Sequence, residues 1–418
     1  MASPKFAEAL ARASQSPTLA SYQEIIQNIP SLSSPETYAP DLIALADVVL
    51  DGSLGVVATR TLVAELIPAL RALADHDVWI QVGQHMVRAI PTTPLSSSLV
   101  EQAAALRELV AAAHEANEDF LDAAKALAEI PLDSSQRRVP DADKAAIWIR
   151  IVRNYLEVDD STTAETYLNK LKNVMHTVDD PELGLHFRLS AARIQDSNRQ
   201  FLQAAKSYHD ISFSPAIAED ERLHTLGMAI KCAILAPAGP LRARALGQLY
   251  KDERSASLEE HGILEKMFFD RLLTSSEVSK FAQDLAPHQL AKTADGSTVL
   301  AKAVVEHNLL SASRLYANIG FDELGLLLGL DGARAEDTTA RMIEQGRLAG
   351  SVDQIERVIW FEGGDASGEK GSGRAEVPVG KEMRRWDGNV QALAEDVERL
   401  TDALQAEFPE FVASQIVV

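Results

Sequence analysis

The chain has 418 residues, of which 46% are hydrophobic and 6% aromatic, and its formal net charge is −21. A chain of this length is too long to fold around one hydrophobic core, so two or three domains are predicted. The composition favours helices over β-sandwiches. The negative charge argues against nucleic acid or an anionic membrane as a partner, and the single cysteine, Cys232, excludes an internal disulfide and a multi-cysteine zinc site.

The N-terminus has no basic segment followed by an apolar one, and no apolar run approaches the length of about 18 residues that a membrane helix needs. We therefore expect a soluble chain that is neither secreted nor inserted in a membrane.

Residues 1–220 are predicted to form a helical-repeat arm. The segment 120–130 recurs at 201–211, and a shorter match at 164–167 lies midway, so the period is 40 to 41 residues. Longer amphipathic helices are predicted before the last two copies, at 144–156 and 182–194. Because neither helix of such a pair buries its apolar face alone, the pattern predicts a mainly α fold, an α-solenoid of hairpins similar to tetratricopeptide repeats. A generic helical bundle is the alternative.

Residues 221–294 continue the helical pattern as the helical part of a second domain, and 295–362 form a distinct unit. It opens with a turn in which Ser297 is placed to cap the next helix. Ile319 lies in a short extended piece, two further helices follow, and Gly346 stands at a left-handed C-cap. Two strands close the unit. Helix, short strand, helix, helix and hairpin in this order predict a winged helix.

Winged helices often bind DNA, so the charge of this unit matters. Between Ile319 and Glu362 there are nine acidic and four basic residues, a net charge of −5. Glu336 and Asp337, expected in the first turn of the recognition helix, would repel a phosphate. The winged helix is therefore predicted to contact protein, and a nucleic-acid binder is the disfavoured alternative.

The C-terminal part is predicted to be a flexible Gly-rich linker, 363–382, followed by a helix at 383–410. Apolar residues of this helix recur at alternating steps of four and three, which is an a/d seam. A narrow apolar stripe on a tethered helix needs a cover, either a helical bundle with partner chains or the chain's own domain. The seam residues are Trp386, Val390, Leu393, Val397, Leu400 and Leu404.

The sequence contains no recognisable catalytic motif. Gly363 and Gly368 have P-loop spacing, but Glu369 stands where a lysine is required. The ten histidines are scattered without an H-E-x-x-H or H-x-H pattern, and Cys232 has no nearby histidine or arginine in sequence. We therefore predict no catalytic, cofactor-binding or metal site, and an enzyme would require an unrecognised constellation.

The predicted order of a helical solenoid, a winged helix and a terminal helix resembles the PCI family, named for the proteasome lid, the COP-nine signalosome and a translation initiation factor. Particular stretches narrow the resemblance, namely Lys231–Ala236, Lys251–Arg254, His261–Met267, Thr293–Ser297 and Glu306–Tyr316. Within the PCI family these stretches resemble most closely the family of fourth subunits of the COP-nine signalosome. The resemblance covers about 140–362 well and the final helix in character, and the Gly-rich linker departs from it.

The resemblance implies a non-catalytic scaffold subunit of the complex that removes Nedd8 from cullin-RING ubiquitin ligases, present in cytoplasm and nucleus. Its partners would be PCI and isopeptidase-type subunits, the latter holding the zinc, with the cullin-RING ligase as substrate and neither nucleic acid nor membrane as partner. A scaffold subunit of the proteasome lid is the alternative.

In the family that the chain resembles, winged helices pair edge to edge and C-terminal helices gather in one bundle. We accordingly expect the last strand of the wing to lie partly in the core and partly at an edge open to β-augmentation. This strand is Val358, Ile359, Trp360 and Phe361.

Overall fold

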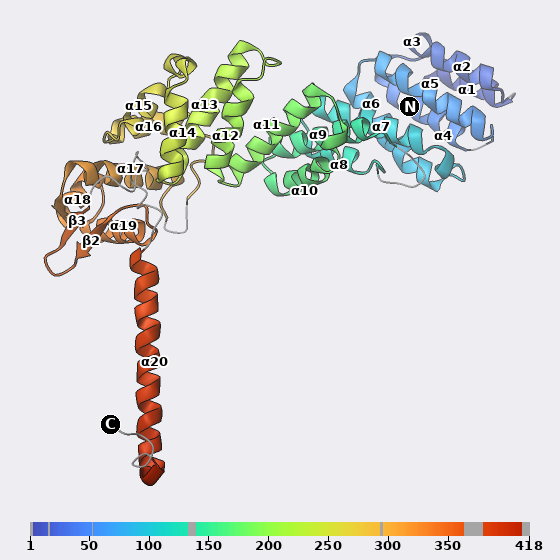
Figure 1. The fold of residues 1–418 in the computed structure, drawn as a ribbon. Helices are drawn as coiled ribbons and strands as arrows, with labels where there is room; N and C mark the ends of the chain where they lie inside the picture. The colour runs from blue at the N-terminus through green and yellow to red at the C-terminus, as the bar shows by residue number, and fades with distance from the viewer. Residues whose placement is uncertain are drawn as a thin grey trace. The chain divides into compact units, whose positions relative to one another are not determined.

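The computed structural model describes residues 3–15, 17–51, 53–132, 139–292, 296–362 and 379–411. These residues are mainly helical, which confirms the predicted fold class (Figure 1). They divide into two compact units, Met1–Asn198 and Arg199–Val418.

The first unit consists of helices with two hydrophobic clusters. One cluster gathers side chains from Phe6 to Leu109, and the other gathers side chains from Ala104 to Ile194. Short 3₁₀ turns lie at Pro35–Thr37, Ile90–Thr92, Ser96–Ser98 and Met175–Thr177. The α-helices are α1 (Pro4–Gln15), α2 (Leu19–Gln27), α3 (Ile29–Leu32), α4 (Tyr38–Leu50), α5 (Val56–Ala72), α6 (His76–Ala89), α7 (Val100–Ala116), α8 (Phe120–Ala128), α9 (Asp141–Glu157), α10 (Ser161–Lys172) and α11 (Pro181–Ser197).

The predicted repeat is visible in the packing of these helices. Helix α7 packs against α8 and α9 against α10, and small buried residues of α8, Ala123 and Ala124, let the neighbouring helices approach closely. After α7, α9 and α11 the chain turns at a residue with a positive φ, namely Glu118 (63°), Asp159 (59°) and Arg199 (59°). These residues follow the same period of 40 to 41 as the sequence repeat.

The second unit begins with helices that lead into the winged helix. Helix α12 packs against α13, so the last predicted hairpin is divided, with α11 in the first unit and α12 in the second. A 3₁₀ turn lies at Glu253–Ser257. The helices are α12 (Phe201–Ser212), α13 (Glu219–Leu235), α14 (Pro240–Tyr250), α15 (His261–Phe268) and α16 (Ser275–Gln283).

The winged helix has the predicted order of elements. It consists of α17 (Val299–Leu315), β1 (Asn318–Gly320), α18 (Phe321–Leu328), α19 (Gly332–Glu344), β2 (Gly350–Asp353) and β3 (Val358–Phe361). The strands form an antiparallel sheet in the order β1-β3-β2, in which Ile359 pairs with Ile319 and Val352. One cluster under this sheet buries Leu309, Phe321 and Ile359.

At two positions of the winged helix the local backbone geometry favours or requires glycine. Gly346 has a φ of +68°, as expected for the residue that ends α19. At Gly350 a Cβ would lie 2.4 Å from the carbonyl oxygen of Trp360, so the close approach of β2 to β3 requires glycine.

Two local predictions in this unit are wrong. The side chain that caps α17 is Thr298, which accepts a hydrogen bond from the Ala301 amide, and not Ser297. Helix α19 begins at Gly332, so Glu336 and Asp337 lie beyond its first turn. A threonine beside a serine offers the same capping chemistry, and the sequence does not distinguish them.

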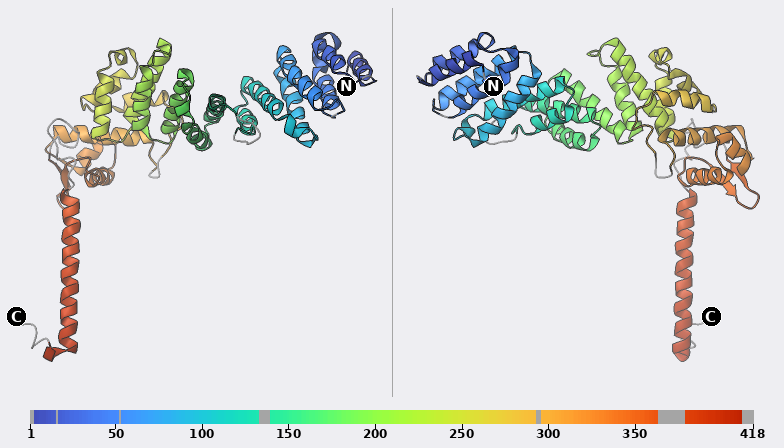
Figure 2. Two further views of the ribbon diagram at one scale, coloured as in Figure 1. Left: turned by 45° about the vertical axis from the view of Figure 1, so that its right-hand side comes forward. Right: turned by 180° about the vertical axis from the view of Figure 1, so that it is seen from behind.

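The C-terminal helix, α20, runs from Val379 to Glu407. It is continuous in both views of Figure 2 and begins four residues before the predicted start at Met383. Residues 363–378, which make up most of the predicted linker, lie outside the described residues.

Candidate interaction surfaces

The predicted a/d seam of α20 is exposed. Trp386, Val390, Leu393, Val397 and Leu400 have exposed fractions between 44% and 66%, and Leu404 is half-buried. The other exposed residues from Asn389 to Glu407 are alanines or polar residues such as Glu395, Asp396 and Arg399. Apolar side chains of this size are normally covered, and within the described part of the chain none of these five is. An exposed a/d stripe of this kind is the surface that one helix of a helical bundle presents to its neighbours.

Strand β3 alternates between the core and the surface. Ile359 and Phe361 are buried, Val358 is half-buried and Trp360 is 47% exposed. Trp360 lines a shallow groove between α19 and the β2–β3 hairpin, together with Ala340 of α19. Ile355 lines the same groove, lies at the tip of the hairpin and is 96% exposed. The exposed apolar surface of the wing therefore consists of Trp360 and Ile355.

The prediction that Val358, Ile359, Trp360 and Phe361 offer a sheet edge is wrong. Strand β3 lies between β1 and β2 and pairs with both, so its backbone groups have partners on both sides. In the described sheet the edges belong to β1 and β2. A strand added to this sheet would pair with one of these two.

A third region holds the winged helix to the helices before it, and we call it the α17 joint. It consists of Glu306, His307 and Asn308, three consecutive polar residues of α17 with exposed fractions of 3%, 0% and 6%. The carboxylate of Glu306 accepts two hydrogen bonds from the guanidinium of Arg347, at 2.5 and 3.0 Å, and a third from the Ala238 amide at 3.1 Å. One side chain thus ties the loop before α14 to the loop after α19.

The other two residues of the joint bind the loop after α15. A ring nitrogen of His307, Nε2, donates to the carbonyl oxygen of Arg271 at 2.9 Å. The side-chain amide of Asn308 bonds both backbone groups of Leu273: its oxygen accepts from the amide at 2.9 Å, and its nitrogen donates to the carbonyl at 3.1 Å. Buried polar groups that are satisfied in this way fix one arrangement of the elements they join.

Burial makes His307 a neutral residue. Desolvation and, to a smaller extent, the nearby positive charges of Arg242 and Arg314 together lower its pKa from 6.5 to about 4, although the hydrogen bond to the Arg271 carbonyl acts to raise it. A neutral ring with its proton on Nε2 suits the carbonyl acceptor.

Sequence reasoning found the seam of α20 but missed the joint. Glu306, His307 and Asn308 belong to a run that carried the family resemblance, yet helical spacing assigns them no role. The available signal was three adjacent polar residues flanked on both sides by apolar pairs, Val304 and Val305 before them and Leu309 and Leu310 after them.

The described residues contain no group of three or more His, Cys, Asp or Glu side chains arranged to hold a metal ion. A search of the described helices also finds none long and apolar enough to cross a membrane.

Two protein-family models match the chain. One is described as PSMD12/CSN4, N-terminal, and matches residues 6–220; the other is described as PCI domain and matches residues 279–362. The first covers the helices of the first unit together with α12, and the second covers the winged helix.

The sequences of similar proteins match nearly the whole chain. COP9 signalosome complex subunit 4 of Neurospora crassa is 65% identical over 96% of this chain and 96% of its own length. The protein of the same name in Emericella nidulans is 49% identical over 96% and 97%, and that of Dictyostelium discoideum is 39% identical over 87% of each.

Proposed function

The chain belongs to the family of COP9 signalosome complex subunit 4, and we propose on this basis that it is a non-catalytic scaffold subunit of a COP9 signalosome. The observation that carries the proposal is 65% identity over 96% of both chains, because similarity of that extent includes the helical repeats and the winged helix together. The relatives compared above all carry the signalosome name, which does not favour a scaffold of the proteasome lid.

Two surfaces of the chain serve assembly in this proposal. The exposed seam of α20 packs into a bundle with helices of other subunits, since its a/d spacing fits that geometry. The winged helix contacts neighbouring subunits through the edges at β1 and β2 and through Trp360.

The activity belongs to the complex in this proposal. The signalosome removes Nedd8 from cullin-RING ligases, a zinc-bearing subunit other than this chain performs the cleavage, and the helical-repeat arm reaches towards the substrate. The chain is proposed to work in cytoplasm and nucleus and to bind neither membranes nor nucleic acid. The net charge of −5 across the winged helix supports the last point, because DNA binding requires clustered basic residues.

The test is native mass spectrometry of the endogenous chain with its partners, before and after deletion of residues 383–418. We expect an eight-protein assembly that includes a zinc isopeptidase and is lost on deletion. A set of proteasome-lid subunits would overturn the signalosome assignment but leave the role of α20 intact. A monomer with or without the deletion would show that the seam is not an assembly surface.

A further inference from the structure

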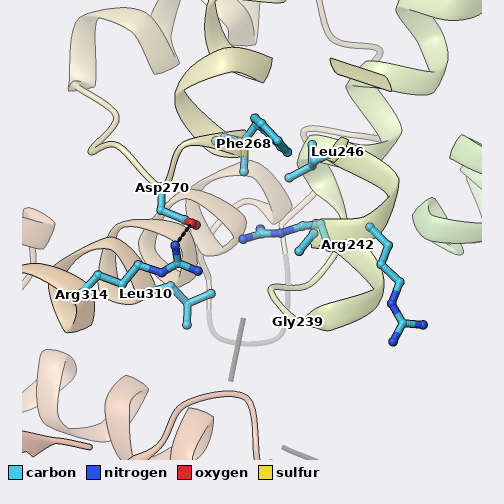
Figure 3. Close-up of a pocket in the computed structure, with 10 residues that line it drawn as sticks. Gly239, Arg242, Leu246, Phe268, Asp270, Leu310 and Arg314 are labelled. Atoms are coloured by element: carbon cyan, nitrogen blue, oxygen red, sulfur yellow. Dashed lines mark ion pairs between the residues drawn. The ribbon is translucent and has the colours of Figure 1, made fainter. Parts of the chain in front are cut away.

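A small pocket lies between α14, the end of α15 and α17, next to the α17 joint. Its cavity volume is about 180 Å³, which is below the range of roughly 300 to 1,000 Å³ that holds drug-sized ligands. Three arginines line it, Arg242 and Arg244 from α14 and Arg314 from α17. Figure 3 shows the guanidinium groups of Arg242 and Arg314 directed into the space between the two helices.

Arg242 is the unusual member of this group because it is only 4% exposed. Within the described part of the chain its guanidinium donates one hydrogen bond, and that bond is long, 3.3 Å from Nη1 to the carbonyl oxygen of Ala236. Among the described residues no carboxylate lies within ion-pair distance of it, and the two carboxylates that attract it pair with other arginines, Glu306 with Arg347 and Asp270 with Arg314. Burial lowers the pKa of Arg242 to about 10, against the attraction of Glu306 and Asp270. A buried charge in this state is costly.

The charges that line the pocket do not balance. Among the described residues that line the pocket, three arginines face one carboxylate, that of Asp270, which leaves a net charge of +2. Asp270 itself pairs with Arg314 at 2.5 Å and attracts Arg242 without lying within ion-pair distance of it. The pocket also includes Gly239 and Ala243 from the first turn of α14, where the helix dipole favours an anion.

We propose that this pocket binds one phosphate group. A dianion matches the net charge of +2, and arginine forks bind phosphate oxygens in pairs. The bound group would bridge Arg242 and Arg244 of α14 to Arg314 of α17, and so would fasten the helices before the winged helix to the winged helix itself. The proposal does not depend on the scaffold function.

The test is titration of the full-length chain with sodium phosphate in a calorimeter, at constant ionic strength set with sodium chloride. We expect saturable binding of one phosphate per chain. Arg244→Ala should weaken it about tenfold, because Arg244 is exposed and its loss removes one charged donor without opening the core. Arg334→Ala is the matched control, since it removes the same charge from an exposed position of α19 that does not line the pocket.

A second variant tests the sign of the effect. Asp270→Asn removes the carboxylate that lines the pocket, and asparagine tolerates the positive φ of 50° at this position. It should tighten phosphate binding several-fold.

Two results would overturn the proposal. One is a wild-type chain that binds no phosphate in excess of chloride, and the other is an Arg334→Ala variant that loses as much affinity as Arg244→Ala. Titration with O-phosphoserine distinguishes the sources of the group. Tighter binding than inorganic phosphate supports a site for a phosphorylated side chain, and equal or weaker binding supports a site for a free phosphate.

Discussion

Helices α17 and α20 reverse the usual relation between polarity and burial, in opposite directions. In α17 the charged and polar side chains of Glu306, His307 and Asn308 are buried, whereas in α20 large apolar side chains such as Leu393 and Leu400 are more than 60% exposed. The polar residues of α17 have their partners within the chain, at Ala238, Arg271 and Leu273. The apolar residues of α20 have none among the described residues.

The difference separates two roles of a helix in a scaffold. Helix α17 fixes geometry inside the chain, because each buried polar group must be satisfied by one particular loop. Helix α20 makes contacts outside the chain in the proposed function, because an apolar stripe accepts any helix of matching spacing and is stabilised only when it is covered. Each prediction below changes one of these two helices.

The largest effect is expected on assembly. Leu393→Glu together with Leu400→Glu places two charges in the seam, so the double variant should no longer co-purify with its partner subunits. Its thermal unfolding should stay unchanged, since both positions are exposed in the chain itself. Affinity purification followed by mass spectrometry measures the first quantity and calorimetry the second.

The control for this experiment adds the same two charges beside the seam, by Gln391→Glu and Gln405→Glu, at exposed positions of α20. It should assemble normally. Full assembly of the Leu393 and Leu400 variant would contradict the role of the seam.

The next largest effect is expected at the joint. Glu306→Gln leaves Arg347, which is 19% exposed, without its carboxylate and should lower the free energy of unfolding by about 3 to 5 kcal/mol. Asp337→Asn breaks an exposed pair with Arg341 and should cost less than about 1 kcal/mol. Denaturant unfolding of the two variants measures the difference, and equal losses would show that the joint is no more than a surface ion pair.

The pH dependence of stability tests His307. Its pKa is about 4 in the folded chain and about 6.5 in the unfolded one, so the unfolded state binds the proton first as the pH falls. The stabilisation is therefore present above pH 6.5 and is lost between about pH 6.5 and 4, by about 3 kcal/mol in all. Unfolding curves measured across this window should show the loss.

His307→Gln should flatten the curve in this window, because glutamine donates to the Arg271 carbonyl without titrating. His176→Gln, at an exposed position, should leave the curve as it is in the wild type. A wild-type curve and a His307→Gln curve that run parallel would contradict the assignment.

The smallest effect is expected for Asp402→Ala in α20. Asp402 is exposed and lies away from the seam, and alanine forms helix more readily than aspartate by about 0.5 kcal/mol. Helix content measured by circular dichroism should rise slightly, and assembly should not change. Loss of assembly would mean that the contact surface of α20 is wider than the seam.

The sequence predicted the winged helix well because its signals are local. Gly346 at a helix end and a short apolar strand around Ile359 are recognisable from neighbouring residues alone. The central place of β3 was not predictable in the same way, because β1 contributes only three residues and pairs across about forty residues of chain.

The α17 joint illustrates the other limit. Periodicity assigns apolar residues to the core and polar residues to the surface, so it gives no reason to place Glu306 and Asn308 in the core. Their burial depends on loops at Ala238 and Leu273 that are distant in sequence. The seam of α20 was readable for the opposite reason, since its pattern lies within one helix.

The residues with left-handed backbone conformation after α7, α9 and α11 bear on how the sequence of a repeat can diverge. At Glu118 and Asp159 the chain reverses direction through a backbone dihedral and not through a particular side chain, and Arg199 has the same dihedral although its charge is opposite to theirs. Substitutions can therefore remove the sequence similarity between the copies while the backbone conformation of the turn is retained. In a diverged relative whose sequence no longer shows the period, the period would still be found in the backbone torsion angles.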